Sequence, residues 1–189
     1  MRRTRILLLV TVIVMTASSA HAFNGLRKGF VLGGGLGLAP ASTWHVDAGF
    51  FGETEESRAG GCSNIFLGYG WDEHNLLVFE GNGSSIMSDK IVDATIFQGF
   101  AGPVWYHYFA PSAPGFFTTV GVGVYSFYFD IKDGEEDAND SGYGLLGGAG
   151  YEFARHWQVS FVINGGRTTR YGADFSHVNL EILVGGVAF

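Results

Sequence analysis

Polar side chains recur at every second position within segments that are otherwise apolar and rich in glycine. Those able to bind ions, water or one another are Glu80, Asn82, Glu152, Gln158, His177, Asn179 and Glu181. Successive side chains of a β-strand point to opposite faces, so residues two positions apart share a face. Carboxylates and amides on the inner faces of several strands can line a path for cations or hydrogen-bond one another in a closed core. We therefore treat these seven residues as candidates for a polar interior.

The segment 142–166 shows the alternation that must position such residues. Its first arm has large apolar or aromatic residues at Tyr143, Leu145, Tyr151 and Phe153, with mostly glycine between them. After a tight turn at 154–156, the second arm has Trp157, Val159, Phe161 and Ile163 on one face. An apolar outer face, aromatic residues at strand ends and a small or polar inner face are typical of transmembrane β-strands. The segment therefore predicts a β-hairpin with one face toward lipid.

The first 22 residues have the three parts of a secretory signal peptide. Arg2, Arg3 and Arg5 give a positive start, residues 6–14 an apolar stretch, and 20–22 a small-x-small cleavage site. The apolar stretch is shorter than the roughly 20 residues that a membrane-spanning helix needs. We expect export with removal of residues 1–22, leaving residues 23–189 as one barrel domain.

The composition of the exported part narrows the class of protein. Without the three arginines of the signal segment, 8 basic residues remain against 18 acidic ones, a net charge of about −10. This balance argues against nucleic acid as a partner, because nucleic acid requires a basic surface. The chain is 47% hydrophobic and has 30 glycines, yet no later apolar run is long enough for a membrane helix. Such a chain is expected to meet lipid through strands.

Alternation and turn signals predict eight strands. The expected ranges are 28–38, 61–71, 75–85, 93–109, 115–129, 143–153, 157–164 and 174–189. Polar stretches at 39–60, 86–92, 130–141 and 165–173 follow the odd-numbered strands, and short turns follow the second, fourth and sixth. Outer-membrane barrels have short periplasmic turns and longer outer loops. The prediction is an all-β fold, an eight-stranded antiparallel up-and-down transmembrane β-barrel.

Pro103, the pair Gly185–Gly186 and Cys62 do not follow the simple alternation of apolar and polar residues. Pro103 cannot donate a ladder hydrogen bond, so we expect a bulge or a local break there. In the last strand the even positions suggest a lipid face, whereas Val187 and Phe189 belong to the odd set, and a slip at Gly185–Gly186 would reconcile the two. Cys62 is the only cysteine, so it forms no internal disulfide and is expected to be a small apolar residue on a strand.

The chain resembles the small outer-membrane β-barrel family that includes the OmpA transmembrane domain and OmpX-like, porin-family barrels. The resemblance rests on Lys28-Gly29-Phe30 with the glycine-alternating strand after it, on the segment 148–153 before a short turn and Trp157, and on the terminal Phe189. It implies a place in the outer membrane of a Gram-negative cell envelope. It also implies that Phe189 is an assembly signal read by the barrel-assembly machinery. No peptidoglycan-binding domain follows the barrel in this sequence.

The expected function is structural or a surface interaction, without enzymatic activity or a cofactor, and with outer-membrane lipid as a partner. Barrels of about eight strands fill their interior with side chains, which favours a polar plug. The alternative is a narrow porin-like channel, in which inward glycines leave a water-filled path lined by acids that favour cations. The sequence is compatible with both the polar plug and the narrow channel.

The sequence also contains weak signals for a lipid-modifying enzyme and for binding of divalent cations. Ser176 beside His177 suggests a lipid-modifying barrel enzyme, but adjacent strand residues point to opposite faces, and no compact nucleophile, base and orienting group is visible. The acidic segment 130–140 could collect divalent cations, since calcium prefers clustered oxygen ligands. Its spacing does not match the EF-hand calcium loop, and a charge run is more often a solvated surface.

Overall fold

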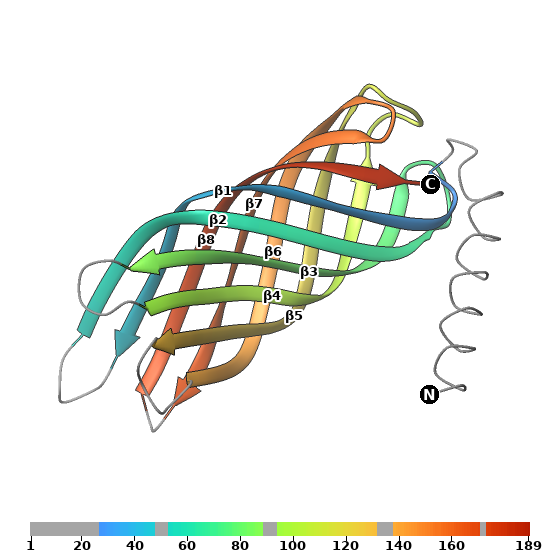
Figure 1. Ribbon diagram of the computed structural model, residues 1–189. Coiled ribbons are helices and arrows are strands. Elements are labelled where there is room, and N and C mark those ends of the chain that lie inside the picture. The colour runs from blue at the N-terminus through green and yellow to red at the C-terminus, as the bar shows by residue number, and fades with distance from the viewer. Residues whose placement is uncertain (1–26, 48–52, 89–93, 132–137, 171–172) are drawn as a thin grey trace, which may run out of the picture.

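The computed structural model describes residues 27–47, 53–88, 94–131, 138–170 and 173–189. Eight strands pair in sequence order, each antiparallel to the next, and β8 pairs with β1 to close the barrel (Figure 1). The strands are β1 (Gly29–Asp47), β2 (Glu53–Gly70), β3 (Asn75–Ser88), β4 (Ala94–Tyr108), β5 (Gly115–Ile131), β6 (Ala138–Ala154), β7 (Trp157–Arg170) and β8 (Ala173–Ala188). The predicted fold class is confirmed. No helix in the described part of the chain is long and apolar enough to cross a membrane.

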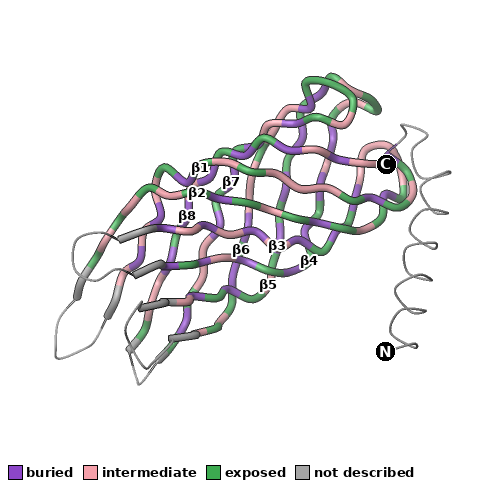
Figure 2. The backbone as a smooth tube through the Cα atoms, in the orientation of Figure 1, coloured by how far each residue is buried: buried purple, intermediate pink, exposed green. Residues whose placement is uncertain are grey.

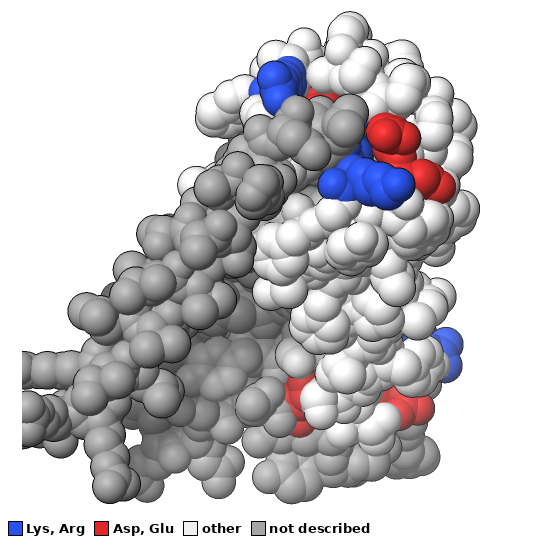
Figure 3. All heavy atoms as spheres, turned by 90° about the vertical axis from the view of Figure 1, so that its right-hand side faces the viewer, with Lys and Arg blue, Asp and Glu red and all other residues white. Residues whose placement is uncertain are grey.

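More buried and more exposed residues alternate along the strands (Figure 2). The outer face carries large apolar residues that a water-soluble protein would bury, such as Leu36 at 75% exposed and Ile65 at 66%. On the face seen in Figure 3, charged side chains lie in two groups with a band of uncharged surface between them. An apolar band bounded by polar ends is the surface that a transmembrane barrel presents to lipid.

The barrel extends further than the sequence predicted at the end opposite the three described turns. These turns, at 71–74, 109–114 and 155–156, define the turn end, and the other is the loop end (Figure 1). The expected polar connection at 39–60 is wrong, because β1 runs to Asp47 and β2 begins at Glu53. The connection expected at 165–173 is likewise mostly strand, and the described residues of the one expected at 130–141 belong to β5 and β6. Backbone pairing needs no apolar alternation, so strands continue past the apolar band into polar sequence.

The extension of β1 depends on a β-bulge that the sequence analysis did not place. Pairing with β2 shifts register between Ala39 and Ser42, and pairing with β8 shifts register between Leu38 and Ala41, so both shifts span Pro40. Ala39 is buried before the bulge and Ser42 and Trp44 after it, so the inward set changes from odd to even positions. A bulge is where a strand tolerates proline.

The proposed slip at Gly185–Gly186 in β8 is wrong. The register with β1 and β7 runs without a shift through both glycines. Odd positions face inward to the end of the chain, and Val187 and Phe189 are each 2% exposed. The terminal phenylalanine therefore packs inside the barrel mouth, which removes the conflict that the slip was meant to solve.

Pro103 produces a local break without a bulge. The ladder between β4 and β5 omits Gly102 and Pro103 and then resumes in the same register at Val104. The proline nitrogen has no hydrogen to donate, so pairing is lost locally while the strand keeps its direction.

Aromatic rings fill the space beside several inward-facing glycines of the barrel. A Cβ added to Gly33 would lie 2.2 Å from Cζ of Phe66, and one added to Gly150 would lie 2.2 Å from Cζ of Phe117. Tyr125 covers Gly144 and Gly166 in the same way. The buried cluster that includes these rings is continuous across the interior. Glycine therefore provides room for rings on the facing strands.

Candidate functional site

All seven polar residues singled out in the sequence have buried side chains inside the barrel. They form three groups along its axis. Glu152 and Gln158 lie near the turn end, Glu80, Asn82, Asn179 and Glu181 share a central network, and His177 is stacked among aromatic rings on the other side of that network.

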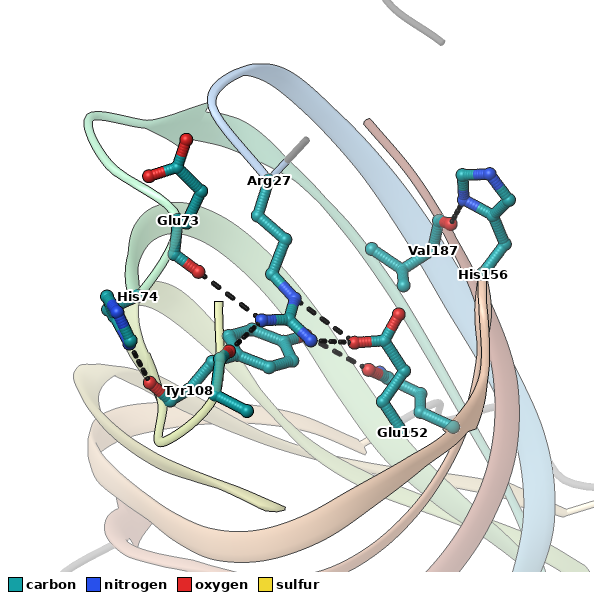
Figure 4. Close-up of polar contacts among 9 residues, drawn as sticks. Arg27, Glu73, His74, Tyr108, Glu152, His156 and Val187 are labelled. Carbon is teal, nitrogen blue, oxygen red and sulfur yellow. Dashed lines mark hydrogen bonds and ion pairs between the residues drawn. The ribbon is translucent and has the colours of Figure 1, made fainter. Parts of the chain in front are cut away.

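The group at the turn end is built around Arg27, which stands just before β1 (Figure 4). Its guanidinium forms an ion pair with Glu152 of β6, and both side chains are 2% exposed. Nη1 donates to the carbonyl oxygens of Glu73 and Ala110 in two of the turns. The guanidinium carbon lies 3.9 Å from the centre of the Tyr108 ring. The Arg27 side chain thus joins the residue before β1 to two turns and to β6 across the mouth.

Tyr108 and Gln158 continue this group toward the barrel centre. The Tyr108 hydroxyl donates to Oε1 of Gln158 over 3.1 Å. The Tyr108 ring also packs at a tilt against Phe117, with centroids 5.0 Å apart, and it stacks on Tyr106 with centroids 6.5 Å apart. A layer of aromatic rings therefore separates the ion pair from the central network.

The central network holds one carboxylate firmly. Glu80 Oε2 accepts a hydrogen bond from the Tyr106 hydroxyl at 2.6 Å, and Oε1 accepts one from the Asn64 amide at 2.9 Å. Asn82 Nδ2 lies 3.5 Å from the same Oε1. Within the described residues, no ion pair supplies a positive charge to Glu80. The carboxylate is therefore compensated by neutral donors, which a buried acid requires.

Amide side chains connect this carboxylate to the opposite wall. The Asn164 amide donates to Asn82 at 2.8 Å and to Glu181 Oε1 at 3.0 Å. Asn179 donates to Asn164 at 3.1 Å and to the Tyr125 hydroxyl at 2.9 Å. Each of these amides uses both amino hydrogens within the network, which fixes its orientation.

Gln98 and Ser84 complete the network on the β3–β4 side. Both donate to Asn179 Oδ1, at 2.5 Å and 3.2 Å respectively, and Ser84 lies 3.1 Å from Ser42 of β1. Side chains from seven strands thus meet in one hydrogen-bonded layer. Such a layer can bind water or fix the packing of the barrel, depending on whether space remains between the groups.

His177 belongs to an aromatic stack beyond the network. Its ring lies 4.7 Å from that of Phe127 and 5.2 Å from that of Tyr125, and its Nε2 is 3.0 Å from the Thr168 hydroxyl. Trp44, Ile86 and Ile96 join Phe127 in a second apolar cluster. Apolar layers therefore bound the polar network on both sides.

Four buried polar atoms in the described residues lack a hydrogen-bond partner. They are Gln98 Oε1, Thr119 Oγ1, His177 Nδ1 and Glu181 Oε2. Buried polar atoms are nearly always paired, with ordered water when no protein group is in reach. Among the described residues, no group of three or more histidine, cysteine, aspartate or glutamate side chains could hold a metal ion.

The other residues considered in the sequence are Ser176, Cys62 and the acidic segment 130–140. Ser176 lies on the outer side of β8 and His177 is buried, so the two side chains do not meet. Cys62 is a buried free thiol whose Sγ lies 3.9 Å from the Ile182 carbonyl oxygen. Most of the acidic segment 130–140, with its expected divalent cations, lies outside the described residues or has side chains that are not described.

Several residues that build the site were not singled out as candidates. Asn64, Asn164 and Tyr106 had the inward spacing, but neutral or aromatic side chains gave no separate signal. Arg27 precedes the first strand, where no alternation exists to assign it a face. Only its contacts in the folded barrel show its place.

Outside the spanning strands, the turn between β2 and β3 contains a well-bonded carboxylate. Asp72 accepts hydrogen bonds from the Asn75 amide at 3.0 Å and from the backbone N–H groups of His74 and Asn75 at 2.8 and 2.7 Å. The pKa of Asp72 is lowered, chiefly by the Asn75 side chain. His74 Nδ1 donates to the Tyr108 carbonyl over 2.7 Å, which ties this turn to the end of β4.

The sequence profile of the family described as outer membrane protein beta-barrel domain matches residues 8–185. The chain belongs to this family. Its apolar outer band and closed eight-stranded sheet agree with that membership. No curated protein sequence matches the chain significantly.

Solved structures show the same fold at low sequence identity. Ail, the attachment invasion locus protein of Yersinia pestis, matches with a TM-score of 0.50 and 8% identity over 84% of this chain and 99% of its own; one of its structures contains the heparin analogue sucrose octasulfate. Neisserial surface protein A matches with a TM-score of 0.50 and 14% identity over 85% and 96%. OprG from Pseudomonas aeruginosa matches with a TM-score of 0.50 and 13% identity over 88% and 98%.

Proposed function

We propose that this chain is a closed, non-conducting outer-membrane barrel with a structural or surface-interaction role. The observation that carries the proposal is the filled interior. Arg27 occupies the mouth at the turn end, and aromatic rings occupy the space beside the inward glycines. Side chains that interlock at three successive levels support a closed interior, as expected for a barrel of eight strands.

The same proposal includes export and assembly. Residues 1–22 act as a cleaved signal peptide, and Phe189 is read by the barrel-assembly machinery. The turn end then faces the periplasm and the loop end faces outward, as in other barrels with an even number of strands. Interaction with host or partner molecules, or with divalent cations at the acidic segment 130–140, is assigned to the loop end.

A narrow channel is the second candidate, and one observation favours it. Gln98 Oε1 and Glu181 Oε2 are buried without partners, so water inside the barrel would satisfy them. A chain of such waters beside Glu80 and Glu181 would favour cations. This candidate requires the layer of Arg27 and Tyr108 to open.

Single-channel recording of the refolded residues 23–189 in planar bilayers separates the two candidates. We expect no discrete conductance from the wild-type barrel and none from Glu80→Gln or Glu181→Gln. Arg27→Ala tests the mouth directly, because it removes the side chain that fills it. Steps in the wild type whose cation preference falls in the two glutamine variants would overturn the closed-barrel proposal. Steps that appear only in Arg27→Ala would support a barrel closed by that residue.

A further inference from the structure

A groove of about 750 Å³ crosses the outer wall of the barrel on strands β5 to β8. Its floor is formed where outward positions are small, at Gly147, Ala149 and Gly165. Its sides include Leu145 and Phe161, which are 62% and 47% exposed. The groove therefore lies on the lipid-facing surface, and the interior network does not form it.

The groove ends at a basic side chain. Arg167 of β7 is exposed and lines the end nearest the loop end, directly opposite Tyr143 of β6 and Ser176 of β8 in the ladders. In the described part of the chain, no ion pair joins Arg167 to an acidic side chain. The carboxylate of Asp174, two residues before Ser176 in β8, accepts a hydrogen bond from Thr169 at 2.9 Å.

The position of Arg167 along β7 matches the edge of the apolar band. Trp157, 55% exposed, begins the strand at the turn end, and Arg167 follows ten residues later on the same face. Ten residues of a strand tilted by about 40° rise roughly 25 Å, which is the height of the apolar band of such barrels. Arg167 and Tyr143 therefore lie at the membrane–water boundary next to the loop end, where a charged side chain costs little.

The groove extends from Arg167 toward the membrane centre over about the thickness of one lipid leaflet. Phe161 lies six residues before Arg167 on the same face, a vertical distance of about 15 Å at that tilt. Half of the apolar band of about 25 Å is roughly 13 Å, so the groove extends over about one leaflet. An acyl chain in the groove would contact Leu145 and Phe161 while its head group reaches the guanidinium.

We propose that this groove binds a phosphate-bearing lipid of the leaflet next to the loop end, with an acyl chain on Gly147 and Gly165 and the phosphate on Arg167. Arginine pairs with phosphate through parallel N–H donors, and the boundary position lets it do so without being buried. The site is independent of conduction, since the side chains that would contact the lipid, Leu145, Phe161 and Arg167, are exposed on the outer face. A neutral head group would leave the guanidinium without an anion.

Native mass spectrometry of the refolded barrel, released from detergent micelles, tests the proposal with dipalmitoyl phosphatidic acid and dipalmitoylglycerol, which has the same acyl chains and no phosphate, as probes. We expect one phosphatidic acid to be retained in preference to dipalmitoylglycerol. Arg167→Gln should weaken its retention about tenfold, the loss of one charge-assisted contact, and Arg167→Lys should weaken it less. Gly147→Leu should also weaken its retention, because the leucine side chain would fill the floor of the groove. The barrel should tolerate this change, since a Cβ at Gly147 would have its nearest contact at 4.0 Å.

Gly81→Leu is the matched control. Gly81 faces outward on β3, away from the groove, and an added Cβ meets nothing within 4 Å. It should leave phosphatidic acid binding unchanged. Equal retention of both lipids, or an equal effect of Arg167→Gln and Gly81→Leu, would overturn the proposal. A dimer that disappears in Gly147→Leu would do so as well, because the groove would then hold a second copy.

Discussion

Arg27 and Glu152 form a buried ion pair across 125 positions of sequence, and through it the residue before β1 is fixed to β6. Arg27→Met should destabilise the barrel by about 3 kcal/mol, because Glu152 would remain buried without its partner. The double variant Arg27→Met with Glu152→Gln should lose less than the sum of the two single variants. Urea unfolding in lipid vesicles, followed by the gel shift of the folded barrel, measures these differences.

An exposed pair supplies the control for this cycle. Arg58 and Glu56 lie 3.0 Å apart, and their side chains are 23% and 41% exposed. The corresponding variants should show a coupling of at most about 1 kcal/mol, because solvent screens the pair. Additive effects of the Arg27 and Glu152 variants would mean that the buried pair contributes no more coupling free energy than the exposed pair.

The sequence was sufficient for the fold because lipid outside and side chains inside impose a period of two on every strand. In the structure the side chains of all seven polar candidates are buried. The strand ends could not be predicted in the same way. Beyond the apolar band, residues such as Ser42 and Thr43 pair through the backbone, and no apolar pattern marks them as strand.

The candidate site was predicted as a set of residues but not as an arrangement. Alternation assigns Glu80 and Glu181 to the interior, yet their connection through Asn82 and Asn164 depends on register between strands. The expected slip at Gly185–Gly186 assumed that Phe189 faces lipid. The chain instead shifts register in β1 near Pro40, and Phe189 turns inward.

The space beside inward glycines can be tested on β6. Gly144→Val should cost about 1–3 kcal/mol, because an added Cβ would lie 3.1 Å from Cβ of Tyr125 and 3.3 Å from the Phe100 ring. Phe100→Leu in the same chain should recover part of the loss. Gly147→Val, three residues later on the outer face, should be tolerated, since its nearest contact is at 4.0 Å. Urea midpoints compare the variants, and an equal cost at both glycines would contradict a filled interior.

The turn between β2 and β3 should respond to acid through Asp72. Its folded pKa is lowered, chiefly by the hydrogen bond from Asn75, so its stabilising effect is fully present above the unfolded pKa of about 3.9. The effect is lost as the pH falls through the folded value. The urea midpoint of wild type should therefore exceed that of Asp72→Ala at neutral pH, and the difference should shrink below about pH 4. Asp72→Asn, which does not titrate, should show no such change relative to Asp72→Ala. A constant difference between wild type and Asp72→Ala down to the lowest pH would exclude this contribution.

Phe189 combines a packing position with a predicted assembly role. Its side chain is 2% exposed, and its ring lies 5.9 Å from that of His156. The Val187 N–H donates to the His156 carbonyl at 3.0 Å, and His156 Nδ1 donates back to the Val187 carbonyl at 2.8 Å. The end of β8 is thus held to the turn after β6. Removing the ring by Phe189→Ala should cost about 3 kcal/mol through the cavity alone.

Phe189→Leu separates packing from recognition. A leucine keeps most of the buried volume, so refolding into vesicles should give a urea midpoint near that of wild type. If the aromatic ring is read during assembly, the leucine variant should still yield less heat-modifiable barrel in the outer membrane of cells. Phe189→Ala and deletion of residue 189 should yield less again. Cellular yields that simply follow the urea midpoints of the refolded variants would leave Phe189 as a core residue and would refute its role as a signal.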